Sequence, residues 1–219
     1  MDEPAHLSAT RASYDIVAAD YEHLLRAEVA SKPIDRAVLA AFAELVLAAG
    51  SGPVVDVGSG SGRITAHLDS LGCDVFGVDL SPGMVAVARR TYPDLRFEEG
   101  SMTALDMADG ALRGIVAWYS VIRTPPDRLP EVFAEFGRVL ALGGQVLLAF
   151  QVGDERVRLE QAYGHAVSLD AYRLTPDRVA DLVTEAGFVV HTRVRREAAG
   201  RERTPQAYLM ASRPVSVAG

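Results

Sequence analysis

The chain has 219 residues and a formal net charge of −7, and 49% of its residues are apolar. This length suits one large α/β domain or two small ones, and the composition is that of an ordinary globular protein. An acidic chain without a stripe rich in lysine and arginine argues against nucleic acid or an anionic membrane as a partner.

The first part of the chain is predicted to be helical. Apolar residues recur at three- and four-residue steps across residues 9–28, which indicates one helix. A second helix is expected to begin at Pro33 and to end at Gly50. From Pro53 onward, short apolar runs alternate with helices that begin near Gly62, Pro82 and Pro126. The predicted strands are residues 54–57, 74–79, 95–99, 114–120 and 144–151.

The end of the chain breaks this alternation. A helix over residues 175–187 is followed by two strands, 188–196 and 206–212, which are joined by a charged loop and read as a hairpin. The expected fold is therefore α/β, Rossmann-like and doubly wound, with a mostly parallel seven-stranded sheet and an antiparallel last strand. One domain is predicted, with an N-terminal helical cap (1–50), a core (51–150), a lid-like insertion (151–174) and a C-terminal helix and hairpin (175–219).

The stretch VVDVGSGSGR, residues 54–63, joins a strand to a helix through Gly58, Gly60 and Gly62. Such a turn lets a backbone approach a dinucleotide or an adenosyl compound. A dinucleotide fingerprint needs a small residue where this chain has Arg63. Asp56 would also repel a pyrophosphate and attract an ammonium and a sulfonium group. The alternative is that Asp56 only bonds the loop backbone.

Asp79 ends the second predicted strand, 21 residues after Gly58. A carboxylate at about this distance suits the two ribose hydroxyls of any adenosine ligand. Its alternative role is to cap the next helix, for which Ser81 is better suited.

With these residues, the chain resembles the class I S-adenosylmethionine-dependent methyltransferases, and most of all their small-molecule type 11 or type 25 group. The resemblance covers nearly the whole chain, through VVDVGSGSGR, VFGVDLSPGMVAVAR and the stretches from Phe97 to Ile122 and from Leu129 to Gln151. It implies S-adenosyl-L-methionine as the cofactor. The resemblance also implies that Asp56 and the backbone of Gly58, Ser59, Gly60 and Gly62 hold the methionine end of the cofactor, and that Asp79 binds its ribose. It implies that Leu80 and Met84 line the adenine face, that Ser101 and Met102 read the adenine edge, and that Trp118 and Tyr119 lie near the reacting methyl. Tyr14 and Tyr21 would belong to a cap helix, where they close over the cofactor or simply anchor that helix.

Three positions depart from the pattern of this group. Ser101 and Gly114 stand where many relatives have aspartates, and Arg123 stands where relatives often have a histidine. Arginine stays protonated near neutrality, so Arg123 can orient an anionic substrate but is a poor base, or it is a surface residue.

A general base would help if the methyl acceptor is a hydroxyl, a protonated amine or an acidic carbon. His23, Tyr163, His165 and Tyr172 are candidates, and His165 is preferred because Gly164 precedes it in a polar segment that looks irregular. The alternative is a loop histidine that bonds the backbone. No spacing of His, Cys and carboxylates suggests a metal site. The basic run over residues 193–203 is interpreted as a solvated face.

The sequence thus predicts methyl transfer to a small molecule, with His165, Tyr119 and Arg123 as catalytic candidates. The alternatives are a cofactor-binding protein that transfers no methyl and, less favoured, an NAD(P)-dependent oxidoreductase. The lone Cys73, the acids and proline in residues 1–7, and the shortness of the longest apolar segment favour a cytoplasmic protein without a membrane partner.

Overall fold

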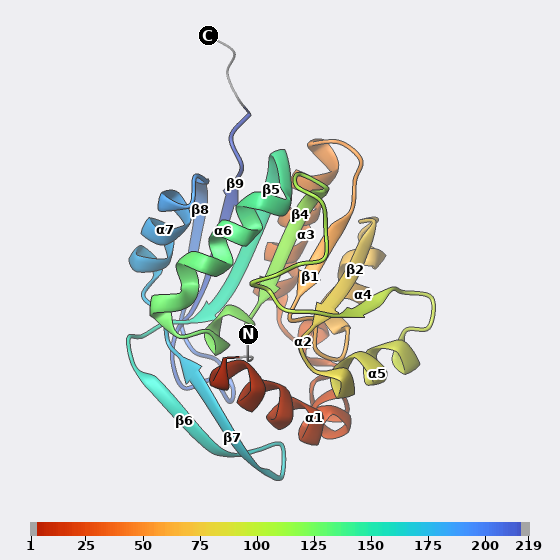
Figure 1. The fold of residues 1–219 in the computed structure, drawn as a ribbon, viewed down its shortest axis with the longest axis vertical. Coiled ribbons are helices and arrows are strands. Elements are labelled where there is room, and N and C mark those ends of the chain that lie inside the picture. Colours follow the sequence, from red (N-terminus) through yellow and green to blue (C-terminus); the bar gives the residue numbers. More distant parts are fainter. Residues whose placement is uncertain (1–3, 216–219) are drawn as a thin grey trace.

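The computed structural model describes residues 4–215. Seven strands form its central sheet: β1 (Val54–Val57), β2 (Val75–Asp79), β3 (Phe97–Glu99), β4 (Leu112–Trp118), β5 (Leu140–Gln151), β8 (Val189–Arg196) and β9 (Gln206–Ser212). Their order is β3-β2-β1-β4-β5-β9-β8, and β9 runs antiparallel to β5 and β8 while the pairs from β3 to β5 are parallel (Figure 1). The predicted fold class is confirmed.

Helices cover both faces of this sheet. The helix α3 (Pro33–Ala48) and the helix α4 (Arg63–Ser70) pack on one face, while α6 (Leu129–Val139) and α7 (Pro176–Glu185) pack on the other. The helix α5 (Pro82–Thr91) lies along β2 and β3. Because helices bury both faces, the central strands are continuous apolar runs rather than alternating ones. None of the helices among the described residues has the length and apolar character needed to cross a bilayer.

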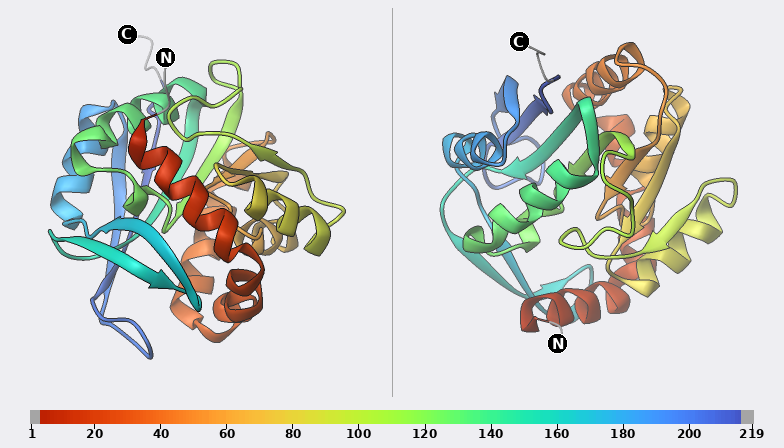
Figure 2. Two further views of the ribbon diagram at one scale, coloured as in Figure 1. Left: turned by 60° about the horizontal axis from the view of Figure 1, so that its bottom comes forward. Right: turned by 45° about the horizontal axis from the view of Figure 1, so that its top comes forward.

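The segment predicted as a helical cap divides into two parts with different positions. The helix α1 (Ala5–Leu25) and the short α2 (Glu28–Ser31) lie at the carboxyl ends of the parallel strands, where α1 crosses the edge of the sheet (Figures 1 and 2). In contrast, α3 flanks the sheet, because its fully buried Leu39 and Phe42 pack with Val116 of β4. Both helices are amphipathic, so periodicity alone did not separate a cap from a sheet-flanking helix.

The segment predicted as a lid-like insertion is a regular antiparallel hairpin of β6 (Arg156–Ala162) and β7 (His165–Tyr172), which pairs Val157 with Ala171 and Leu159 with Leu169. It is therefore not irregular. The strand β7 packs against α1 (Figure 2). The alternation of apolar and polar residues that makes this hairpin amphipathic is present in the sequence but short.

Two short 3₁₀ helices, η1 (Val121–Arg123) and η2 (Pro126–Arg128), connect β4 to α6. The helix expected near Pro126 thus begins as a 3₁₀ turn and continues as α6. The predicted helix over residues 9–28 begins earlier, at Ala5, and ends at Leu25. Thr175, Pro176 and Gly187 frame α7 as expected, although Thr175 makes no side-chain capping bond.

Candidate functional site

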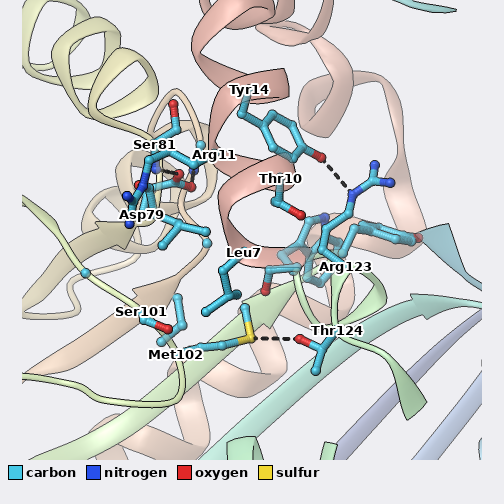
Figure 3. Close-up of a pocket in the computed structure, with 18 of the residues that line it drawn as sticks. Leu7, Thr10, Arg11, Tyr14, Asp79, Ser81, Ser101, Met102, Arg123 and Thr124 are labelled. Carbon is cyan, nitrogen blue, oxygen red and sulfur yellow. Dashed lines mark hydrogen bonds between the residues drawn. The ribbon is translucent and has the colours of Figure 1, made fainter. Parts of the chain in front are cut away.

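A pocket lies where β1, β2, β3 and β4 end and α1 crosses above them (Figure 3). It encloses about 760 Å³, open solvent at its mouth included. The order of strands reverses between β1 and β4, and open α/β sheets bind ligands at such a switch point. Residues that end the four strands or follow directly on them form its floor: Val57, Gly58, Asp79, Leu80, Gly100, Ser101, Tyr119 and Ser120.

The glycine turn brings bare backbone to this floor. Gly58 has φ 73°, and a Cβ on it would lie 2.3 Å from the Cβ of Ser120, which follows β4. Gly60 has φ 55°, a conformation that L side chains rarely adopt. The Gly60 amide donates to Asp79 Oδ2 at 2.7 Å, so the turn is held against the end of β2.

Asp79 accepts two backbone hydrogen bonds, one from Gly60 and one from Ser81, whose amide lies 2.9 Å from Oδ1. Ser81 caps α5 through its hydroxyl, which accepts from the Met84 amide at 3.1 Å. Burial raises the pKa of Asp79 to about 6, against the opposing effect of these backbone bonds. Asp79 is therefore not the cap of α5, and its carboxylate keeps acceptor capacity toward the pocket.

Asp56 is buried beneath the turn rather than on the pocket surface. Its Oδ2 accepts from the Thr65 hydroxyl at 2.7 Å, which ties β1 to α4, and its Oδ1 has no partner among the described residues. Burial raises the pKa of Asp56 to about 7, and the proximity of Asp79 adds to this rise. Both the hydroxyl and the backbone of Thr65 bond Asp56, so the backbone it contacts belongs to α4.

Tyr14 and Arg123 form the opposite wall. Arg123 Nε donates to the Tyr14 hydroxyl at 2.9 Å (Figure 3), and Nη1 donates to the Asp170 carbonyl of β7 at 3.2 Å. Burial raises the pKa of Tyr14 although the Arg123 charge opposes this. Arg123 is thus positioned by α1 and by the hairpin, and it is not a free surface side chain.

Tyr119 stands out on the floor because its φ is 56°, a left-handed conformation that is strained for a tyrosine. Burial raises the pKa of its hydroxyl well above the ordinary range, so the phenol stays protonated near neutrality. Its ring meets Trp118 edge to face with centroids 5.7 Å apart.

The predicted site residues fall into two groups. Eleven line the pocket: Tyr14, Tyr21, Gly58, Gly60, Asp79, Leu80, Ser101, Met102, Trp118, Tyr119 and Arg123. Asp56 lies beneath the glycine turn, and Ser59 and Gly62 belong to the turn without lining the pocket. Met84 is fully buried between α1 and α5 with Val17 and Val87, where it supports the cap helix.

His165, the preferred base, lies outside this lining. It begins β7, and its Nε2 is 2.7 Å from Oδ2 of Asp20 on α1, in a partly exposed pair. Its side chain thus contacts α1 instead of the pocket, and the preceding Gly164 belongs to the hairpin turn.

Sequence reasoning missed the first turns of α1. Leu7, Thr10 and Arg11 line the pocket together with Tyr14, and Arg11 Nε donates to the Leu80 carbonyl at 3.1 Å. Asp15, also unpredicted, accepts from the Ser81 hydroxyl at 2.6 Å and so docks α1 on α5. The spacing of residues 7, 10, 14 and 21 on one helical face could have identified the first group. Ser120 and Thr124, after β4, were missed as well.

Comparison with known proteins agrees with this geometry. Residues 54–144 match the family model of the methyltransferase domain. The chain is 38% identical over 92 residues to a demethylmenaquinone methyltransferase of Chlorobaculum parvum, over 42% of this chain and 37% of that protein. It is 32% identical over 136 residues to the demethylmenaquinone methyltransferase of Beutenbergia cavernae, over 62% of this chain and 55% of that protein. These curated relatives therefore extend well beyond the region they share with this chain.

Among solved structures, the 1,6-didemethyltoxoflavin-N1-methyltransferase of Burkholderia thailandensis, with bound 1,6-didemethyltoxoflavin and S-adenosylhomocysteine, superposes with a TM-score of 0.70. The match covers 98% of this chain and 94% of that one at 18% identity, and it speaks for the fold. Residues 54–144 thus match a methyltransferase domain, as the sequence resemblance predicted, and the fold is shared with a solved methyltransferase structure.

Proposed function

We propose that this protein binds S-adenosylmethionine in the pocket at the strand ends and transfers its methyl group to a small molecule. The observation that carries the proposal is the glycine turn at the switch point, flanked by the buried carboxyl group of Asp56 and the partly buried one of Asp79. Relatives named for methylation of small molecules support the choice of substrate class.

The residues present fit a cationic adenosyl compound better than a polyanion. Asp56 Oδ1 is buried without a partner, and burial holds the pKa of both carboxyl groups above the ordinary value. A nearby ammonium or sulfonium charge would favour their ionised forms, whereas a diphosphate would oppose them. The close approach of Gly58 to Ser120 leaves no room for a side chain where the backbone would meet the ligand.

Each lining residue then has a proposed role. Asp79 accepts hydrogen bonds from the ribose hydroxyls, and Ser101 and Met102 lie at the adenine edge. Ser101 already shares its hydroxyl with Thr103 at 2.9 Å, so it is a weaker adenine acceptor than a carboxylate would be. Tyr14 and Tyr21, whose rings meet edge to face, close the pocket from α1.

The cofactor supplies an already activated methyl group, so the chain has mainly to align the reactants and exclude water. Among the described lining residues the proton-accepting groups are few: Asp79 is the only carboxylate, and there is no histidine or lysine. The Tyr119 hydroxyl is buried beside Tyr208 and stays protonated, so it accepts no proton, and Arg123 can orient an acceptor but not deprotonate it. We therefore assign Tyr119 and Arg123 to positioning, and keep His165 as the base candidate for an acceptor that reaches the hairpin.

Isothermal titration calorimetry with S-adenosylmethionine, S-adenosylhomocysteine and NADH tests the proposal. We expect heat from the two adenosyl compounds and none from NADH. Incubation with methyl-labelled S-adenosylmethionine and a metabolite extract then tests transfer, with a labelled small molecule as the expected product. NADH binding without adenosyl binding would overturn the cofactor assignment, and binding without any labelled product would favour the non-transferring alternative.

A further inference from the structure

A second, larger groove adjoins the pocket, and Arg123 lies on both. The groove runs between the end of α1 and α2, the β6–β7 hairpin and the loop between β8 and β9, and it encloses about 1780 Å³ with open solvent included. The groove and the pocket in which we place the cofactor therefore adjoin at the side chain of Arg123.

The charge of this groove is opposite to that of the whole chain. Its lining has five cationic residues but only two acids, Glu28 and Glu202. Lys32 is paired with both acids, at 2.8 and 2.9 Å, and Arg173 is paired with Glu155 at 2.6 Å. Three cationic residues remain. Arg123 donates to a tyrosine hydroxyl and to a backbone carbonyl. Arg201 and Arg203 have no partner in the described part of the chain.

The loop that carries Arg201 and Arg203 is fastened at the residue between them. Glu202 bonds Lys32, which joins α2 to α3, and also Arg196 of β8. These bonds outweigh the burial of Glu202 and lower its pKa to about 2, so it remains ionised. The loop is therefore tied to the body of the protein at Glu202 while Arg201 and Arg203 line the groove.

Most of the remaining lining of the groove is apolar, with Ser31, Gln151 and Thr204 as its polar members. Leu24 and Leu25 line it from α1, and Val157, Leu159 and Ala171 line it from the hairpin. Asp170 of the hairpin does not neutralise it, because its carboxylate bonds Arg156 at 2.8 Å and Arg158 on the other face of the strands. The groove thus combines an apolar wall with three guanidinium groups that lack a carboxylate partner among the described residues.

We propose that this groove binds the methyl acceptor, and that the acceptor is an apolar small molecule carrying a carboxylate or a phosphate group. Arg201 and Arg203 attract its negative charge, and Arg123 orients it where the groove meets the pocket. Guanidinium groups recognise both kinds of anion through charge-assisted hydrogen bonds, and the apolar wall covers the body of the molecule. The part of this inference that makes the bound molecule the methyl acceptor rests on the proposed function. The anion site itself does not require the cofactor.

Calorimetric titration with 2-naphthoate, 2-naphthyl phosphate and the neutral 2-naphthamide tests the site, with and without S-adenosylhomocysteine. We expect at least one anion to bind about tenfold tighter than the amide, and this preference to shrink at high salt. The tighter of the two anions identifies carboxylate or phosphate as the acceptor group. Absence of S-adenosylhomocysteine heat would count against the proposed function alone, because the anion titration stands without it.

The double variant Arg201→Gln with Arg203→Gln should weaken anion binding roughly fivefold to tenfold and leave binding of the amide and of S-adenosylhomocysteine unchanged. The matched control replaces Arg90 of α5 and Arg178 of α7, which are exposed and outside both cavities, and so makes the same change in net charge. Equal affinity for anions and amide, no binding of any probe, or the same loss in both double variants would overturn the inference.

Discussion

The two cavities that meet at Arg123 have opposite character. The pocket at the strand ends is built on bare glycine backbone over two carboxyl groups whose pKa burial raises, whereas the groove is lined by arginines and apolar side chains. One favours a positively charged ligand and the other a negatively charged one. In our two proposals, one sheet edge keeps two ligands apart by charge and holds them next to each other.

The pocket and the groove are formed by different parts of the fold. The pocket floor belongs to strands β1 to β4, whose register is determined by a buried core. The groove belongs to the β6–β7 hairpin and the β8–β9 loop, which are outside that core. We therefore expect changes in the glycine turn to have larger effects than changes in the groove.

Replacement of Gly60 by valine should have the largest effect. The residue has φ 55°, and a Cβ would lie 3.5 Å from the Tyr21 ring, so the branched side chain would fill the space between turn and cap. We expect a loss of S-adenosylhomocysteine affinity of about a hundredfold or more, read by calorimetry. The control is Gly72→Val, at φ 90° with nothing within 4 Å. It should share the backbone strain but keep full affinity, and equal affinity losses in both variants would assign the effect to folding.

Asp79→Asn keeps the shape of the side chain and removes its charge. We expect cofactor affinity to fall by about 1–3 kcal/mol, or roughly fivefold to 150-fold, because the ribose hydroxyls lose a charged acceptor. Calorimetry with S-adenosylhomocysteine measures this. Unchanged affinity would mean that Asp79 serves only the Gly60 and Ser81 amides.

Asp56→Asn should change how stability depends on pH. The pKa of Asp56 is about 7 when folded against 3.8 ordinarily, so between about pH 4 and pH 7 the folded state holds more protons than the unfolded state. The free energy of unfolding of the ligand-free protein therefore falls as pH rises through this window. In the variant this fall should be smaller, with a Tm at pH 8 roughly 5 °C above wild type. Parallel melting curves across pH would contradict the assignment.

His165→Gln should have the smallest effect. Its contact with Asp20 is partly exposed, so we expect at most about 1 kcal/mol of stability and no change in cofactor affinity. Thermal melting and turnover of an identified acceptor are the measurements. A hundredfold loss of turnover with normal melting would instead support His165 as the base.

Much of the fold could be predicted because local signals agreed with the global arrangement. Short, mostly apolar runs bounded by turn residues, such as residues 54–57, favour strands buried on both faces. Ser81 and Gly187 mark helix ends by their own chemistry. The glycine turn and Asp79 could be placed on one sheet edge because the carboxyl ends of parallel strands meet there.

What the sequence did not reveal depends on long-range contacts. The basic run over residues 193–203 was read as a solvated face, but Arg196 is largely buried and bonds Asp35 and Glu202. Asp35 lies 161 positions away, and no local pattern indicates such a partner. In the same way, the direction of His165 depends on the turn at Gly164, and the division of the cap depends on which surface each helix meets.

Trp118 gives this protein a built-in reporter. It is the only tryptophan of the chain, and it lines the pocket beside Tyr119. Excitation of the indole therefore samples one place in the molecule, and a ligand that arrives there should alter the emission without a competing background. Binding could thus be followed by fluorescence on the unlabelled wild-type chain, including the rate at which a ligand enters the pocket beneath α1.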